Sequence, residues 1–236
     1  MNEESGILCP GEEKTVEKNA IEALMGDYIY KKNSWKAIEF TEERLGEIGM
    51  CLAAEKNRKV INQVTSRIKS ADSIYKKMRR KSYPADKAGI LSCNDLLGVR
   101  TVCLFMDDVY EVARCLKKQK DIRILKEKDY IKKPKNNGYM SLHLIIEVPV
   151  GAGKNAGKDA DRGNETKKEN QWRKVEVQLR TVAMDFWSVL DHQLVYKKEF
   201  PGAESIGREL KDYAVTIAEL DKNMLGLREK IERLNV

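Results

Sequence analysis

The chain has 236 residues, of which 42% are hydrophobic and 34% are charged. This composition provides enough apolar material for a hydrophobic core and excludes a wholly disordered chain. No apolar run approaches the roughly 18–20 residues that cross a bilayer, and the first residues lack the basic and apolar segments of a secretory signal, so we expect a soluble protein. The formal net charge of +7 at pH 7 suits a phosphate-rich ligand or a nucleic acid.

The N-terminal part of the chain is predicted to be helical. Apolar residues recur at helical spacing over residues 14–27 and again over residues 41–52. A third helix is expected to begin at Ser70, because serine is a good N-cap and Asp72 follows in the first turn.

Strands alternate with helices in the middle of the chain. Four runs rich in β-branched or aromatic residues predict strands at residues 99–105, 122–128, 140–148 and 174–181. A helix capped by Asp107 or Asp108 separates the first two strands, and another helix starts near Ala183. Residues 151–172 carry many charges and no aliphatic side chain larger than alanine, so they form an exposed insertion. This order predicts an α/β or α+β domain around a mixed β-sheet.

The last predicted helix carries an apolar heptad pattern. Its apolar residues alternate between spacings of three and four: Leu210, Tyr213, Ile217, Leu220, Met224, Leu227, Ile231 and Leu234. So narrow a stripe favours self-association in the manner of a coiled coil. The alternative is a helix packed on its own domain, which also needs an apolar face. Gly226 inside the pattern costs about 1 kcal/mol of helix stability.

The strand at residues 174–181 carries polar side chains on one face. Side chains alternate between the two faces of a strand. The core face carries Val175, Val177 and Leu179, and the opposite face carries Glu176, Gln178 and Arg180. Taken alone, this is also the pattern of an ordinary solvated sheet face.

A second strand and a loop would extend this polar face. If residues 140–148 pair with this strand, Ser141 and His143 join its polar face. The adjoining basic loop carries Lys133, Lys135 and Tyr139. Tyrosine offers an aromatic plane to a base, lysines bind phosphates, and a carboxylate such as that of Glu176 accepts a proton from a hydroxyl. The surface therefore has the components of a nucleotide site.

A basic segment precedes the first predicted strand. Its cations are Arg67, Lys69, Lys76, Lys77, Arg79, Arg80 and Lys81, against the single acid Asp72. Helical spacing places Lys77 and Arg80 on one face with Ser73 and Lys76. A nucleoside triphosphate or an RNA backbone would be a natural counterpart, although part of this charge is what a solvated helix face carries.

A carboxylate and an arginine flank a glycine turn in the sequence NDLLGVR. Asp95 can ligate magnesium, and Arg100 can bind phosphate or stack on a base. Taken alone, Asp95 is also typical of a loop or capping residue.

Five cysteines without a CxxC pair and only two histidines argue against disulfides and a zinc cluster. Any divalent ion would be held by carboxylates, and the reduced thiols indicate the cytoplasm.

Four segments together resemble the synthetase domain of the RelA/SpoT family. They occur in the family's order and near its spacing: RIKSADSIYKKMRRK, NDLLGVR, KDYIKKPKNNGYMSLH and VEVQLRTVAMDFWSVLDH. The resemblance runs from about Val60 to Lys198, without the insertion. The length and the terminal helix are similar to those of the small alarmone synthetases, most of all their RelQ-type branch.

The resemblance implies a nucleotidyltransferase-like mixed sheet of about five strands with flanking helices. It also implies the family's reaction, the Mg²⁺-dependent transfer of the β,γ-pyrophosphate of ATP to the ribose 3′-hydroxyl of GTP or GDP. The products are AMP and guanosine penta- or tetraphosphate, the alarmones of the stringent response. In this chain, Asp95 and Glu176 correspond to the two metal-binding or catalytic carboxylates.

The resemblance further implies two nucleotide sites. The ATP side corresponds to Arg67, Lys69, Ser70, Lys77, Arg80 and Arg100, in which Arg67 and Arg100 sandwich the adenine. The acceptor side corresponds to Lys133, Lys135, Tyr139, His143 and Gln178, in which Tyr139 stacks on the guanine. Two such sites on opposite sides of one metal ion would align a hydroxyl with the β-phosphorus and offset the repulsion of a polyanion.

Some positions depart from the family pattern. Met140 stands where a polar or basic residue commonly follows the Gly-Tyr pair, and Asp191 replaces the usual glutamate before His192. The insertion at 151–172 is longer than expected. Because both histidines of the chain lie inside synthetase motifs, we expect no alarmone hydrolase activity.

The organisation implied is a helical region at 1–58, a synthetase domain at 59–200 and an oligomerisation helix at 201–236, assembled as a homotetramer. Two other functions are left open by the sequence. One is a toxin-like enzyme that pyrophosphorylates the 3′ end of tRNA, which the basic surplus would suit. The other is a catalytically silent protein that binds nucleotides or RNA.

Overall fold

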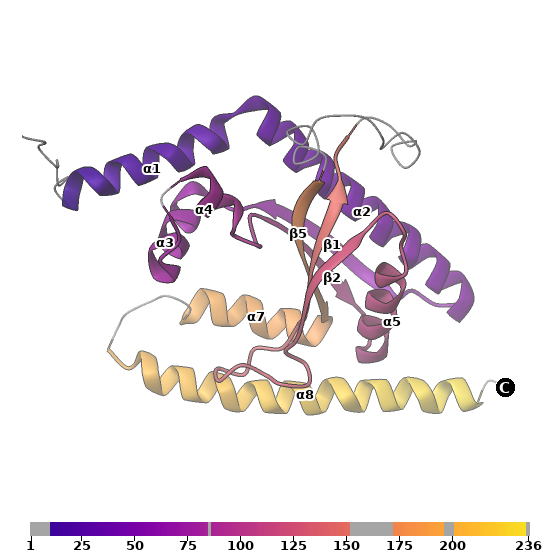
Figure 1. The fold of residues 1–236 in the computed structure, drawn as a ribbon. Coiled ribbons are helices and arrows are strands. Elements are labelled where there is room, and N and C mark those ends of the chain that lie inside the picture. The colour runs from indigo at the N-terminus through magenta and orange to yellow at the C-terminus, as the bar shows by residue number, and fades with distance from the viewer. Residues whose placement is uncertain (1–9, 85, 152–171, 196–200, 235–236) are drawn as a thin grey trace, which may run out of the picture.

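The computed structural model describes residues 10–84, 86–151, 172–195 and 201–234. Its helices are α1 (Pro10–Gly26), α2 (Tyr28–Lys56), α3 (Ala71–Lys81), α4 (Lys87–Leu91), α5 (Met106–Lys117), α7 (Val182–Leu194) and α8 (Ala203–Leu234). Its strands are β1 (Ile61–Ile68), β2 (Leu97–Cys103), β3 (Arg123–Asp129), β4 (Leu142–Pro149) and β5 (Trp172–Thr181). Figure 1 shows their arrangement. Within the described ranges, no helix is both long and apolar enough to cross a membrane.

The five strands form one mixed sheet in the order β1-β2-β5-β4-β3. β2 and β5 run parallel, and every other neighbouring pair is antiparallel. Helices flank this sheet, with α7 and α8 side by side along its lower side in Figure 1. The predicted mixed sheet of about five strands is therefore confirmed. Almost all of the predicted insertion, residues 152–171, lies outside the described residues.

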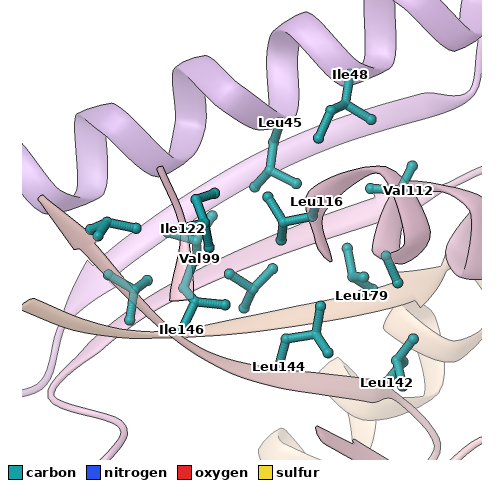
Figure 2. Packing of buried hydrophobic residues seen from close by; sticks show 14 of the residues in the cluster. Leu45, Ile48, Val99, Val112, Leu116, Ile122, Leu142, Leu144, Ile146 and Leu179 are labelled. Carbon is teal, nitrogen blue, oxygen red and sulfur yellow. The ribbon is translucent and has the colours of Figure 1, made fainter. Parts of the chain in front are cut away.

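One face of the sheet packs against α2 and α5 (Figure 2). The central side chains are Leu45 and Ile48 of α2, Val112 and Leu116 of α5, and Leu144 and Leu179 of the sheet. The alternation predicted for two strands holds, since Leu142, Leu144, Ile146, Val175, Val177 and Leu179 are all buried in this core. A fully buried side chain of this size contributes about 1.5–3 kcal/mol, so the core holds the opposite, polar face of the sheet in place.

Several boundaries differ from the prediction. α2 begins at Tyr28, well before residue 41, because Asp27 caps it by accepting a hydrogen bond from the backbone N–H of Tyr30. β1 was not predicted at all, since its alternation is masked by polar residues on its exposed side. The remaining predicted helices and strands occur within a few residues of their expected ends.

The predicted cap of α5 is wrong. Phe105 is the N-cap residue, with extended backbone and no side-chain cap hydrogen bond, and Asp107 and Asp108 lie inside the first turn. Their carboxylates interact favourably with the positive end of the helix dipole, and they also form ion pairs with arginines outside α5. Asp108 pairs with Arg58 at 2.8 Å, and Asp107 pairs with Arg228 of α8 at 2.8 Å.

α8 combines both interpretations of the heptad pattern. Its inner side packs on the domain through Leu210 and Ala214, which contact Trp187 of α7. Farther along, the buried Asp221 accepts a hydrogen bond from the hydroxyl of Thr181 at 2.6 Å. The outer side leaves much of the heptad exposed, at Tyr213, Leu220, Met224, Leu227, Ile231 and Leu234.

Candidate active site

Strand register aligns the polar side chains of the sheet into rows. The first row contains Arg67, Gly98, Glu176 and Ile145. The second contains Thr65, Arg100, Gln178 and His143. Residues that are partners in register point to the same face. The two polar strands pair as expected. The sheet brings five of the predicted site residues from four strands onto one surface: Arg67, Arg100, His143, Glu176 and Gln178.

Glu176 is held at the centre of this face by two donors. Its Oε1 lies 3.2 Å from Nδ1 of His143, and its Oε2 accepts a hydrogen bond of 2.9 Å from the amide of Gln178. Burial raises the pKa of the Glu176 carboxyl, but these hydrogen bonds outweigh burial and hold its pKa below the usual value. Glu176 is therefore an ionised, oriented carboxylate at neutral pH.

A chain of hydrogen bonds runs from Arg180 to this carboxylate. Nη2 of Arg180 donates to the hydroxyl of Tyr139 at 2.7 Å, and that hydroxyl lies 2.8 Å from Nε2 of His143. Since a carboxylate only accepts, Nδ1 of His143 carries the proton toward Glu176. In the neutral ring, Nε2 then accepts from the hydroxyl of Tyr139. Burial raises the pKa of the Tyr139 hydroxyl, which keeps its proton available for this bond.

Asp95 precedes β2 and is enclosed by two lysines. Nζ of Lys69 lies 2.6 Å from Oδ2, and Nζ of Lys77 contacts Oδ1. Burial raises the pKa of Asp95, but the hydrogen bonds from Lys69 and Lys77 outweigh it and leave the pKa lowered. The Asp95 charge in turn raises the pKa of Glu176, so the two carboxylates lie within electrostatic reach of each other.

The segment between β1 and α3 positions the lysines. The backbone N–H of Lys69 donates to the carbonyl of Leu96 at 2.8 Å, next to Asp95. Ser70 is the N-cap of α3, as predicted, and its hydroxyl accepts from the backbone N–H of Ser73. Lys77 then projects from the second turn of α3 to Asp95.

Two arginines predicted to hold the adenine lie on neighbouring strands. The exposed side chain of Arg67 passes over Gly98, where an added Cβ would lie 3.7 Å from its Cγ. Arg100 follows two residues after Gly98 on β2 and is therefore the diagonal neighbour of Arg67. Diagonal neighbours in an antiparallel pair lie about 7–8 Å apart, which is the space that one flat ring needs between two guanidinium planes.

The acceptor loop, residues 132–140, packs against α8. Gly138 has φ +91° and an added Cβ there would lie 2.5 Å from Cβ of Ala214, so only glycine fits. Nζ of Lys135 lies 4.3 Å from the centroid of the Tyr139 ring. Met140, one of the departures from the family pattern, is buried. The other, Asp191 of α7, hydrogen-bonds Asn137 of this loop, while burial raises its pKa.

Two predicted residues stand apart from these contacts. Arg80 on α3 and Lys133 in the acceptor loop are exposed, and neither side chain has a hydrogen-bond or ion-pair partner in the described part of the chain. Long basic side chains can reach the phosphates of a ligand from the rim of a site. Both residues therefore remain candidates for contact with a bound nucleotide.

Sequence reasoning missed the roles of three residues. Arg180 was placed on the polar face but given no role, although it is 4% exposed and contacts four side chains. Asp185 of α7 was not considered, because its partner Arg100 is 85 residues away. Lys128 of β3 was also missed, and it is the register partner of His143 at the edge of the same row. Alternation in β3 alone could have indicated Lys128.

The donor set of the site fits magnesium. Asp95 and Glu176 supply oxygen from two carboxylates, and the described residues contain no group of three or more His, Cys, Asp or Glu arranged for a metal. A small number of carboxylates combined with substrate phosphates is the way proteins usually bind Mg²⁺, whereas zinc prefers closed nitrogen and sulfur sites. The residues present therefore suit an ion that arrives with a polyphosphate.

The polar face carries Glu176 and two arginines beside the loop of Tyr139, and the turn before β2 adds Asp95 with its two lysines. Such a face on a mixed sheet defines a nucleotide-binding enzyme of the phosphoryl-transfer class. Residues 66–200 match the family described as the region found in RelA/SpoT proteins. The chain belongs to the RelA/SpoT family.

Two curated relatives match over most of their length. The chain is 39% identical to GTP pyrophosphokinase YwaC of Bacillus subtilis over 173 residues, 73% of this chain and 76% of the relative. It is 30% identical to GTP pyrophosphokinase YjbM of Bacillus subtilis over 197 residues, 84% of this chain and 86% of the relative.

Solved structures show the same fold. The small alarmone synthetase 2 from Bacillus subtilis is similar with a TM-score of 0.68 and 35% identity, covering 84% of this chain and 96% of that one. The small alarmone synthetase 1 from Bacillus subtilis bound to its product pppGpp is similar with a TM-score of 0.69 and 30% identity, covering 85% of this chain and 95% of that one.

Proposed function

We infer that the protein is a GTP pyrophosphokinase that transfers the pyrophosphate group of ATP to the ribose 3′-hydroxyl of GDP or GTP, with release of AMP. The inference rests on one observation above all. Asp95 and Glu176 are eighty-one positions apart in sequence, yet Asp95 stands three residues before Gly98, the register partner of Glu176. The named activity of relatives at 39% and 30% identity supports the same conclusion.

We assign the ATP side to the end of the face where β2 begins. We propose that Arg67 and Arg100 sandwich the adenine, which the separation of diagonal neighbours on β1 and β2 supports. Lys69 and Lys77 approach Asp95 closely. Ser70 caps the start of α3, and Arg80 lies exposed in the last turn of the same helix. A polyphosphate entering here would meet ammonium groups that are already oriented.

We assign the acceptor side to the opposite end, where β5 ends and the acceptor loop lies. We assign the ring of Tyr139 to the guanine; in the structure Nζ of Lys135 lies over that ring, 4.3 Å from its centroid. His143 and Gln178 hold Glu176 in place. Lys133, together with Lys128 at the edge of β3, is available for the acceptor phosphates.

The chain's own groups then perform two tasks. Arginines and tyrosine align the two nucleotides, which replaces an encounter of separate molecules by reaction within one complex. Glu176 accepts the proton of the 3′-hydroxyl at its carboxylate oxygen, because it is ionised and held by His143. A Mg²⁺ ion held by Asp95 and Glu176 would, when bound, neutralise charge on the phosphates and activate the phosphorus toward attack.

We propose that the exposed stripe of α8 mediates self-association, with a homotetramer as the family resemblance implies. α7 adds to the apolar surface, since Phe186 is 57% exposed and Leu194 is 49% exposed on it. Exposed apolar patches on this scale usually mark an interaction surface.

We also propose that the enzyme is cytoplasmic, in keeping with its free thiols. Its proposed functional divisions are residues 1–58, 59–200 and 201–236.

The test is a transfer assay with ATP carrying a γ-phosphate label. Wild-type protein, Mg²⁺ and one acceptor at a time, GDP, GTP, GMP or tRNA, are incubated, and labelled products and AMP are separated by ion-exchange chromatography. The proposal predicts labelled guanosine tetra- or pentaphosphate with equimolar AMP. Label on tRNA alone would replace it by the tRNA 3′-end activity, and no AMP with any acceptor would replace it by a silent binding protein.

A further inference from the structure

The buried guanidinium of Arg180 links side chains from both ends of the site. Its side chain is 5% exposed and donates through both terminal nitrogens. Nη2 donates to the hydroxyl of Tyr139 and to Oε1 of Gln178, each at 2.7 Å. Nη1 donates to Oγ of Ser188 at 2.9 Å and to Oδ1 of Asp185 at 3.2 Å. Four hydrogen bonds to four side chains from three segments leave this arginine almost no freedom to reorient.

Asp185 continues the link to the other end of the site. The same oxygen that accepts from Arg180, Oδ1, also accepts from Nη1 of Arg100 at 3.2 Å. Asp185 stands in the first turn of α7, which begins at once after β5. One carboxylate oxygen therefore fixes the guanidinium of β2 relative to that of β5.

The cluster is asymmetric in charge. Two guanidiniums share one carboxylate, and neither Nε, of Arg100 or of Arg180, has a hydrogen-bond partner in the described part of the chain. Because both arginines bind the carboxylate of Asp185, a substitution of Asp185 removes an ion-pair partner from each of them. Arg180 is the buried member of the cluster, and a buried charge depends strongly on its partners, so it is the more sensitive of the two arginines to a change at Asp185.

We propose that Arg180 and Asp185 are a positioning pair that sets the distance between Arg100 and Tyr139 and so couples the binding of the two nucleotides. This proposal rests on the proposed function, in which Arg100 contacts the donor base and Tyr139 contacts the acceptor base. The pair touches neither nucleotide. It acts through the two residues that do, so a nucleotide that orders one of them also orders the other.

The test compares Asp185→Asn and Arg180→Lys with the double variant. Asparagine keeps an acceptor oxygen but loses the negative charge. Lysine keeps the positive charge but loses the two terminal guanidinium nitrogens that bind separate partners. The matched control is Asp121→Asn, since Asp121 also binds an arginine, Arg44 at 2.6 Å, but does so between α2 and the segment before β3. The KM values for ATP and for GDP, kcat and Tm are measured for each protein.

Coupling predicts that each single variant raises both KM values at least fivefold. The double variant should be no worse than the more severe single variant, because residues that act as a unit are not additive. For Asp185→Asn, kcat should stay within about threefold of wild type, since its contacts do not include Asp95 or Glu176. Asp121→Asn should lower Tm at most and leave both KM values unchanged.

Two results would overturn the pair. One is KM values within twofold of wild type in both single variants, whatever their Tm. The other is a multiplicative double variant in which Asp185→Asn affects only ATP and Arg180→Lys only GDP. Either result leaves wild-type AMP release intact, whereas failure of the proposed function would remove AMP release from the wild-type protein itself.

Discussion

Replacing Glu176 by glutamine removes a charge while preserving the shape of the side chain. Glu176 accepts hydrogen bonds from His143 and from Gln178. Glutamine has a single carbonyl oxygen, so one of these donors must face an NH₂ group instead. Gln178 cannot turn its amide to help, because its Oε1 accepts from Arg180. As long as the proton of His143 stays on Nδ1, the variant therefore keeps only one of the two hydrogen bonds.

The structure gives two magnitudes for this change. An unmatched buried donor costs about 1–3 kcal/mol of folding stability. Loss of a general base costs about 10²–10⁴-fold in rate, which is about 3–5 kcal/mol of transition-state stabilisation. We therefore expect Glu176→Gln to fold with a lowered Tm, to lose at least about 10³-fold in kcat and to keep its KM for ATP within about threefold.

The assay is AMP release from ATP with saturating GDP, resolved by liquid chromatography. Glu147→Gln is the matched control, because Glu147 lies on the same face of β4 as His143 and its nearest cation, Arg123, is 4.0 Å away. That control should retain near-wild-type kcat. A kcat of Glu176→Gln within tenfold of wild type, in a folded protein, would refute the catalytic role of this carboxylate.

Three further changes test other parts of the account. Tyr139→Ala should raise the KM for GDP about 5- to 150-fold and the KM for ATP far less, because stacking on a base contributes about 1–3 kcal/mol; equal effects on both would assign the ring to another role. Met224→Glu combined with Leu227→Glu should lower the mass in light scattering without unfolding the chain, since both side chains are about half exposed; an unchanged mass would remove the outer stripe of α8 from the interface. Asp221→Asn should keep its hydrogen bond from Thr181. Burial raises the pKa of Asp221, so its contribution to stability is present at low pH and is lost as the pH rises through that pKa. The variant should therefore narrow the difference in Tm between about pH 4 and pH 8, a range that starts near the ordinary pKa of aspartic acid. An unchanged difference would show that burial does not raise the pKa of Asp221.

The sequence predicted the parts of the site that lie along single strands. Alternation placed Glu176 and Gln178 together on one face, and it placed His143 on the matching face of another strand. These predictions succeed because a buried face imposes a period of two on a strand.

The remaining features depend on contacts between distant segments. Asp185 meets Arg100 only because α7 follows β5 directly and β2 lies beside β5. Gly138 reads as an ordinary turn residue in the sequence, while its requirement for glycine comes from Ala214 on α8. The heptad pattern in α8 was consistent either with self-association or with packing on the chain's own domain. One helix can present a face to each, and in the structure Leu210 is buried while Leu227 is exposed.

The most direct measurement is a crystal structure of the enzyme with a non-hydrolysable ATP analogue, GDP and Mg²⁺. We expect one ion with a carboxylate oxygen of both Asp95 and Glu176 at about 2.0–2.1 Å, and with phosphate oxygens completing its shell. An ion bound away from either side chain, or the two carboxylates turned to separate ligands, would contradict it.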